Sequence, residues 1–351
     1  MQDKESQAAN EISDWLVVRI LPLGSFYAGH SFSVGQVEIS YKPMEPPAAQ
    51  KALEESKKSF NYEADISSLP RAKVIVRNTN RIQALNQGSQ LIEEVLDVIN
   101  FCALDFGDVR TLGIGYLQDL LTKQYHPVHR ADDVAFDSPM FVLDTELDNP
   151  YPWNLFRILL EKPKHSRSEL EQRVLNAVSW LRQAKFQRNT VRELLFRWIA
   201  LEVLLKERKR KVIANKALVA IGFPESKIFK KLEPAIQQEL KTEQKFKLWK
   251  KELEKRFKDI QNLRKHIVHE GFKDIELSTA GCTLPLEDYL QAIRMAAARA
   301  IGFACVGLAL GCKTVQELWA RKEEIFLKQY PDCAHEILRN VIPLLESPVK
   351  L

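Results

Sequence analysis

The stretch LRKHIVHEG, residues 263–271, brings together side chains suited to acid–base chemistry on a phosphate. A histidine takes up or gives a proton near neutral pH, and a guanidinium can hold two phosphoryl oxygens as charge builds on them. When the 2′-hydroxyl of RNA is the nucleophile, such groups need no metal ion to break a phosphodiester. Arg264 and His269 are therefore candidate catalytic residues, with Lys265 and His266 as supporting groups.

The Arg-x-x-x-x-His spacing is weak evidence by itself, because the composition predicts roughly 0.4 such pairs by chance. Position adds to it. Arg264 lies at the edge of an apolar stripe, where a charged guanidinium is costly to bury unless it is paired or binds a ligand. His269 falls just before Gly271, a natural helix C-cap, and the helix dipole there favours the protonated imidazole. On an ideal helix the two residues point about 140° apart, so they cooperate only if the helix end relaxes or a second copy supplies the missing group.

A long helix over Glu243–His269 is expected to carry these residues. Its apolar positions fall on one stripe. They are Phe246, Trp249, Leu253, Phe257, Ile260 and Ile267. A second long helix, over Pro285–Leu310, has small residues that allow close helix contact. These are Ala296, Ala300, Gly302, Ala304 and Gly307.

The whole chain after Ser168 has the pattern of helices. Three capping boxes mark helix starts: Ser168 with Glu171, Thr190 with Glu193, and Thr314 with Glu317. No strand pattern and no internal repeat interrupts them. An all-α helical bundle is expected over residues 165–312, with a C-terminal helical extension over residues 313–351.

The first 160 residues predict a mixed α/β domain. Short β-branched segments suggest strands, and Ile82–Phe101 suggests a helix capped by Asn78 or Thr79. The expected strands are Trp15–Leu23, Ser33–Ser40, Ala72–Val76 and Met140–Asp144. Prolines and polar residues in Asn149–Asn154 and Lys162–Ser168 place a domain boundary there. The expected fold is an α+β N-terminal domain over residues 1–160, as a possible sensor or regulatory part, followed by the all-α bundle.

Bulk composition predicts an ordinary soluble protein, with 45% hydrophobic and 28% charged residues. The polar N-terminus does not resemble a signal peptide, and the apolar, uncharged stretch Ala300–Cys312 is too short to span a bilayer. The five cysteines form no Cys-x-x-Cys, which favours neither a zinc knuckle nor a disulfide framework. A reducing cytoplasm is the expected location, with no membrane partner and no cofactor.

Charge is unevenly distributed. Between Lys206 and Lys273 there are 20 Lys and Arg against 9 Asp and Glu, which leaves 31 against 37 elsewhere. A basic block on a mildly acidic body suggests a polyanionic partner, and a solvated helical face with Lys–Glu pairs is the alternative. The candidate RNA-binding residues are Lys250, Lys251, Lys255, Arg256 and Lys258.

Other motifs carry less weight. The Gly113–Gly115 stretch, GIG, lacks the third glycine of a dinucleotide-binding loop, because Gln118 stands in that place. A metal-dependent hydrolase centred on His126, His129 and Asp133 is a further hypothesis, although a polar surface loop explains the YHPVHRADD stretch as well. Cys305 and Cys312, seven apart, are expected to be core thiols on one face of an apolar helix.

The order NAVSWLRQAK, RELLFRWIALEVLL, NLRKHIVHEG and a long small-residue helix resembles the HEPN superfamily, and its Apea-like branch most of all. The resemblance covers about Ser168–Leu310. It is carried by the Trp198–Glu202 segment together with Arg-x-x-x-x-His before Glu-Gly. It implies metal-independent RNA cleavage by Arg264 and His269, in a cleft shared by two protomers, with a role in antiviral defence or as a toxin.

The chain departs from the family pattern at one position. The family commonly has Asn, Asp or His after the motif arginine, whereas this chain has Lys265. Glu202 matches the family's frequent acidic residue and is expected to orient Arg264, unless it is a simple partner for Lys206 at i+4. The alternative function is therefore a non-catalytic HEPN scaffold, or a module that binds RNA or a protein partner.

Overall fold

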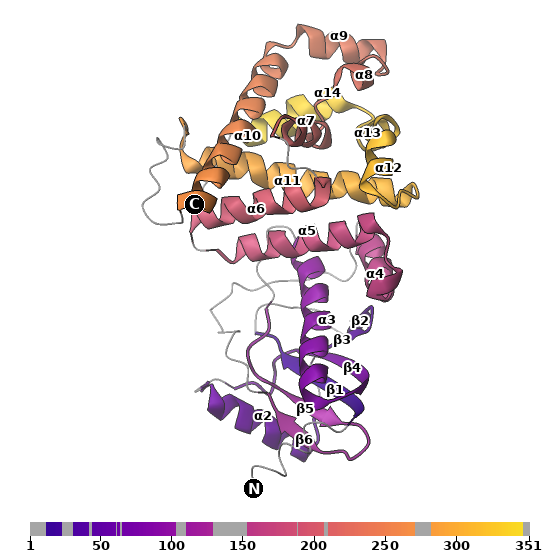
Figure 1. Ribbon diagram of the computed structural model, residues 1–351, viewed down its shortest axis with the longest axis vertical. Coiled ribbons are helices and arrows are strands. Elements are labelled where there is room, and N and C mark those ends of the chain that lie inside the picture. The colour runs from indigo at the N-terminus through magenta and orange to yellow at the C-terminus, as the bar shows by residue number, and fades with distance from the viewer. Residues whose placement is uncertain are drawn as a thin grey trace. The chain divides into compact units, whose positions relative to one another are not determined.

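The computed structural model describes residues 12–22, 31–41, 44–60, 62–63, 65–102, 110–128, 153–187, 189–206, 210–270 and 282–346. The chain divides into two compact units, Met1–His165 and Ser166–Leu351. The first contains an antiparallel sheet with helices, and every described element of the second is a helix (Figure 1). The coarse prediction of an α+β part followed by a helical part is confirmed.

The sheet of the first unit has the strand order β2-β3-β4-β1-β5-β6, and all neighbours are antiparallel. Its strands are β1 (Ser13–Ile20), β2 (Phe32–Val34), β3 (Val37–Ser40), β4 (Arg71–Thr79), β5 (Gly115–Asp119) and β6 (Tyr125–Pro127). The unit also contains α2 (Pro47–Ser59), α3 (Arg81–Cys102) and α4 (Trp153–Glu161), and the 3-10 helix η1 (Lys164–Ser166) follows.

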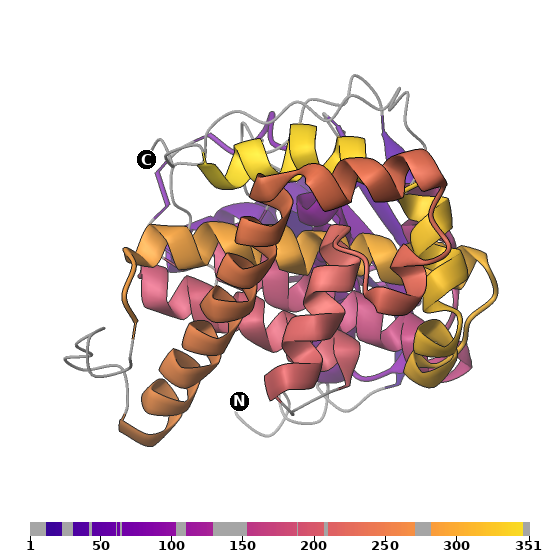
Figure 2. The same cartoon turned by 90° about the horizontal axis from the view of Figure 1, so that it is seen from above.

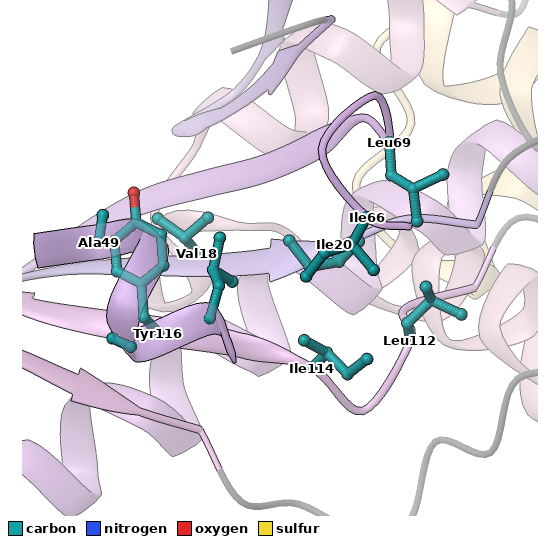
Figure 3. Packing of buried hydrophobic residues seen from close by; sticks show 10 residues of the cluster. Val18, Ile20, Ala49, Ile66, Leu69, Leu112, Ile114 and Tyr116 are labelled. Atoms are coloured by element: carbon teal, nitrogen blue, oxygen red, sulfur yellow. The ribbon is translucent and has the colours of Figure 1, made fainter. Parts of the chain in front are cut away.

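Strand β1 lies at the centre of the sheet and sends alternate side chains to two helices. On one face Val17 packs against α3 so closely that a Cβ on Gly88 would lie 2.6 Å from a Val17 methyl. On the other face Val18 and Ile20 pack with Leu53 of α2 in one buried apolar cluster (Figure 3). Each face of the sheet is therefore covered by a helix, and this burial stabilises the unit.

The local structure differs from expectation at three places. The segment Ser33–Ser40 is not one strand, because a two-residue turn with Gly35 at φ +59° folds it into the β2–β3 hairpin. Helix α2 was not expected. Helix α3 is capped by neither Asn78 nor Thr79: the Asn80 Oδ1 accepts a hydrogen bond from the Gln83 N–H at 2.9 Å.

Two motif regions of the first unit are strands. Gly115 begins β5, where a Cβ would lie 2.1 Å from the Val18 carbonyl oxygen, so this glycine serves close strand approach. The YHP part of the expected surface loop forms the edge strand β6. The expected strand Met140–Asp144 lies outside the described residues.

The second unit begins with α5 (Glu169–Lys185), whose capping box between Ser168 and Glu171 is present as predicted. Helix α6 (Thr190–Leu205) is capped by Asn189 rather than Thr190. The remaining helices are α7 (Arg210–Ile221), α8 (Ser226–Phe229), α9 (Pro234–Thr242), α10 (Gln244–Glu270), α11 (Leu286–Ala309), α12 (Val315–Ala320), α13 (Lys322–Gln329), α14 (Cys333–His335), the π-helix η2 (Glu336–Val341) and α15 (Ile342–Glu346). Thr314 caps α12 by accepting from the Glu317 N–H at 3.1 Å.

Helix α11 is the central helix of this unit and contacts α5, α6, α7 and α10. Helix α10 runs obliquely across α6 and α11 (Figure 2). Among the described residues, α11 is the one helix long and apolar enough to cross a membrane, and 61% of its most apolar window is buried inside the protein. Such burial is that of a core helix and is compatible with a soluble protein.

The two cysteines expected on one helix face are separated by the end of α11. Cys305 lies within the helix, whereas Cys312 follows it, after Gly311 with φ +84°. The Cys312 N–H donates to the Gly307 carbonyl oxygen at 2.9 Å and closes the helix end. Both thiols are buried, so their expected place in the core is confirmed, but not their shared helix face.

Candidate functional site

Helix α10 carries the candidate catalytic motif in its last two turns. All six apolar positions predicted for its stripe are buried. These are Phe246, Trp249, Leu253, Phe257, Ile260 and Ile267. The stripe fixes the rotation of the helix about its axis, and with it the direction in which each residue of the motif points.

The start of α11 holds α10 in place near the motif. The Tyr289 hydroxyl donates to the Asp259 Oδ2 at 3.1 Å, and both residues are buried. The same hydroxyl accepts from the backbone N–H groups of Thr283 and Leu284, at 3.0 and 3.3 Å. Burial raises the pKa of Tyr289, which keeps its proton available for the contact with Asp259.

Arg264 lies at the edge of the apolar stripe and contacts Glu202 of α6. Its Nη2 donates to the Glu202 Oε2 at 3.2 Å, and 34% of its side chain is exposed. Its Nε is buried and has no hydrogen-bond partner among the described residues. One nitrogen of the guanidinium is thus committed to Glu202, and the exposed part of the side chain keeps donors for an anion.

A hydrogen bond within α6 fixes the position of the Glu202 carboxylate. Its Oε1 accepts a hydrogen bond of 2.8 Å from the Nε1 of Trp198, which is fully buried one helical turn earlier. The alternative partner Lys206 binds Glu169 instead, at 2.7 Å. The two oxygens of Glu202 therefore join a buried indole to the motif arginine. Trp198 was recognised only as part of a motif, although its i, i+4 spacing from Glu202 could have indicated this contact.

The backbone of α10 is helical through Glu270, so His269 lies in its last turn. The side chain of His269 and the expected cap Gly271 lie outside the described residues. A regular helix directs residues 264 and 269 about 140° apart. Relaxation of the helix end, one of the two conditions for cooperation, is therefore not observed in the described backbone of α10. Lys265 is exposed and His266 is half-buried.

The candidate RNA-binding lysines lie mainly on the solvent side of α10. Lys251, Lys255 and Lys258 are exposed. The Lys255 Nζ donates to the Thr283 Oγ1 at 3.0 Å. Lys250 is half-buried and donates to the Pro224 carbonyl oxygen at 3.3 Å. The three exposed lysines form a cationic surface, which we call the α10 lysine face.

Arg256 does not belong to that face, which corrects its prediction as an RNA-binding residue. It is 6% exposed, and its Nε donates to the Glu252 Oε1 at 3.1 Å. Its Nη1 donates to the Asp288 carbonyl oxygen at 3.1 Å, and its guanidinium lies 5.1 Å from the centre of the Trp249 ring. Arg256 therefore connects α10 to α11 and has little surface to offer a phosphate.

The second glutamate of α6 that binds across helices was interpreted only as part of a capping box. Glu193 is buried and accepts from Arg294 of α11 through both oxygens, at 2.8 and 2.9 Å. Its Oε1 also accepts from the Arg197 Nε at 2.8 Å. Glu193 and Glu202 thus fix α6 against α11 and α10 respectively.

The alternative metal site receives no support from its described member. The His126 Nδ1 lies 3.2 Å from the Arg81 Nη1, and burial and this guanidinium lower the pKa of the imidazole. His129, Asp132 and Asp133 lie outside the described residues. Within the described ranges no three His, Cys, Asp or Glu side chains gather as metal ligands would. Comparison of the chain with protein-family models, with curated proteins and with solved structures found no match.

Proposed function

We propose that this protein is a metal-independent endoribonuclease of the HEPN type, with Arg264 and His269 as its catalytic residues. The observation that carries the proposal is the contact between Arg264 and Glu202, which is anchored in turn by Trp198. An arginine held at a helix edge by a carboxylate, with 34% of its side chain exposed, suits recognition of a phosphate.

The reaction follows from the side chains. The neutral imidazole of His269 takes the proton of the ribose 2′-hydroxyl, and the 2′-oxygen attacks the adjacent phosphorus. The bond from phosphorus to the 5′-oxygen breaks, and a protonated imidazole gives that oxygen its proton. The products are a 2′,3′-cyclic phosphate and a free 5′-hydroxyl. Arg264 stabilises the charge that builds on the phosphoryl oxygens.

Two protomers supply the groups for one cleft. A single straight helix directs Arg264 and His269 to different sides, whereas a two-fold dimer places two arginines and two histidines around one axis. One imidazole then acts as the base and the other as the acid. Lys265 and His266 adjoin the site as supporting groups.

The α10 lysine face holds the RNA backbone. Lys251, Lys255 and Lys258 carry positive charge on the same helix as the motif, and such contacts bind phosphates without reading bases. We place the activity in the cytoplasm, in antiviral defence or a toxin-like role. The first unit would then act as sensor or regulator.

Incubation of the purified protein with RNA in EDTA tests the proposal. We expect cleavage to persist under chelation and to leave 2′,3′-cyclic phosphate ends, identified by mass spectrometry. His269→Ala and Arg264→Ala should each abolish it. Loss of cleavage on chelation, or full cleavage by His269→Ala, would exclude this function.

A non-catalytic RNA-binding module is the second candidate function. Lys265 after the motif arginine favours it. This candidate predicts RNA that stays intact under all conditions, with affinity that falls as salt concentration rises.

A further inference from the structure

A groove lined by residues of α5 and α6 has the chemistry of a base-binding site. It has a volume of about 300 Å³. It is lined by Asn176, Ser179, Trp180 and Gln183 of α5 and Val203 of α6. Positions 176, 180 and 183 recur at helical spacing, so they share one face of α5. This size lies at the lower end of the range for small-molecule sites.

The lining residues that the structure describes are uncharged, with one aromatic ring and several polar groups. Trp180 is half-buried and is braced edge-on by Phe196, with ring centres 5.4 Å apart and planes at 64°. The side chains of Ser179 and Gln183 make no hydrogen bond to another described residue. Asn176 accepts at its Oδ1 from the Gln172 Nε2 at 2.8 Å, which leaves its amide N–H groups uncommitted.

A flat, uncharged ligand with donors and acceptors at its edge fits these walls best. An indole offers a stacking surface, and Asn and Gln amides match the edges of nucleobases. None of the described lining residues is a carboxylate or a cation, which disfavours a charged small molecule. An aliphatic helix of a partner protein would leave the three polar side chains unpaired.

The groove and the residue that holds the candidate catalytic arginine involve consecutive positions of α6. Val203 directly follows Glu202, the residue that holds Arg264, and consecutive residues point about 100° apart around a helix. The groove therefore lies on the α5 side of α6, and Glu202 lies on the α10 side. A strand that crosses the end of α6 reaches both within a few nucleotides, because a helix is about 10–12 Å across.

We propose that this groove binds one unpaired nucleobase of the RNA, close to the phosphodiester that is cut, by stacking on Trp180 and hydrogen bonding to Gln183 and Asn176. The proposal rests on the proposed function for its substrate. It makes the substrate single-stranded, because a base within a duplex cannot enter.

The binding of a 12-nucleotide 2′-O-methyl RNA, which lacks the nucleophile and stays intact, tests the groove by fluorescence anisotropy. We expect Trp180→Ala to weaken binding of the single strand about tenfold and Trp180→Phe to weaken it much less. Gln183→Ala should weaken it about threefold, whereas Gln238→Ala, which removes an exposed amide on α9, should have no effect. The duplex of the same sequence should bind equally to all these variants.

Unchanged affinity of both Trp180→Ala and Gln183→Ala for the single strand overturns the base site. Sedimentation of the same variants separates the base site from a dimer interface. If Trp180→Ala and Gln183→Ala separate a dimer and RNA affinity falls only in proportion, the groove is an interface between two copies, and the proposal is wrong. If the variants lose single-strand binding while the unmodified protein never cleaves RNA, the base site stands and the nuclease proposal fails. If the unmodified protein cleaves RNA and Trp180→Ala cleaves it equally well, the nuclease proposal stands and the base site fails.

Discussion

Glu202 and Arg264 lie 62 residues apart in the chain and meet at 3.2 Å, where α6 and α10 cross. The pair contributes little to stability, because 34% of the arginine side chain is exposed and such pairs are worth about 0–1 kcal/mol. The main effect of the pair is to position the Arg264 guanidinium. A carboxylate fixed by a buried indole confines the guanidinium to one side of the helix, and an ordered guanidinium loses less entropy when it binds a phosphate.

Glu202→Gln should lower the rate of RNA cleavage more than it lowers stability. The amide can still accept from Trp198 but loses the charge that attracts Arg264, so we expect kcat to fall about tenfold while KM changes less than twofold. The unfolding free energy should change by less than about 1 kcal/mol. Initial rates and urea unfolding give both quantities. Glu323→Gln, which breaks the surface pair with Lys231, is the control and should leave both unchanged.

Arg256 and Lys251 should behave in opposite ways. Arg256→Ala leaves the Asp288 carbonyl and Glu252 without their buried partner, so we expect the unfolding free energy to fall by about 2–3 kcal/mol. Lys251→Ala should cost less than about 0.5 kcal/mol, yet reduce the slope of log affinity against log salt by about 0.7 for single-stranded RNA. A reduced slope in folded Arg256→Ala, equal to that of Lys251→Ala, would contradict the assignment of Arg256 to the core.

Two glycines of α11 provide a matched pair for the packing of the second unit. A Cβ on Gly307 would lie 2.2 Å from the Leu318 Cδ1, so Gly307→Ala should lower the unfolding free energy by about 1–3 kcal/mol. A Cβ on Gly302 would meet only the Gln329 Nε2, at 3.4 Å. Gly302→Ala should therefore be neutral or stabilise the helix by up to about 1 kcal/mol. Thermal unfolding of both variants measures the difference. Equal changes in unfolding free energy would argue against close contact of α11 with α12.

The first unit should lose stability in mild acid through His126. Burial and the Arg81 guanidinium lower the pKa of this imidazole below 6.5, with Asp119 opposing them. Below pH 6.5 His126 is protonated in the unfolded chain but still neutral in the folded chain. The unfolding free energy therefore decreases as the pH is lowered, until the pH lies below the pKa of the folded state.

Arg81→Met removes one of the two causes and should raise the His126 pKa, as measured from the imidazole proton shifts by NMR. It should also reduce the acid sensitivity of unfolding. The pKa should remain below 6.5, because burial is the larger cause. Arg77→Met, at an exposed position on β4, is the control. A pKa that rises equally in both variants would show that the contact with Arg81 is not responsible.

Strong periodicity made the long elements predictable. The stripe of α10 has six apolar residues at helical spacing, and all of them are buried. The same spacing could have placed Arg256 correctly, since it lies seven residues after Trp249 and four before Ile260. The count of basic residues did not show that Arg256 lies on the buried face, because net charge does not indicate which face of a helix a side chain occupies.

Short-range signals failed where two arrangements satisfy the same rule. Glu193 three residues after Thr190 fits a capping box, but asparagine is an equally good cap, and the Asn189 Oδ1 accepts from the Arg192 N–H at 3.1 Å. Its partner Arg294 lies 101 residues away, which no local pattern indicates. The contact of Glu202 with Arg264 was expected only through family resemblance, because spacing within a helix says nothing about which other helix lies opposite.

The unbroken course of α10 to Glu270 has a consequence for how such an enzyme would be controlled. In the proposed dimer no movement within one chain would be needed to complete the cleft, so the amount of complete cleft would depend on how often two chains meet. Specific activity would then decline on dilution, and the amount of protein made would set the onset of cutting.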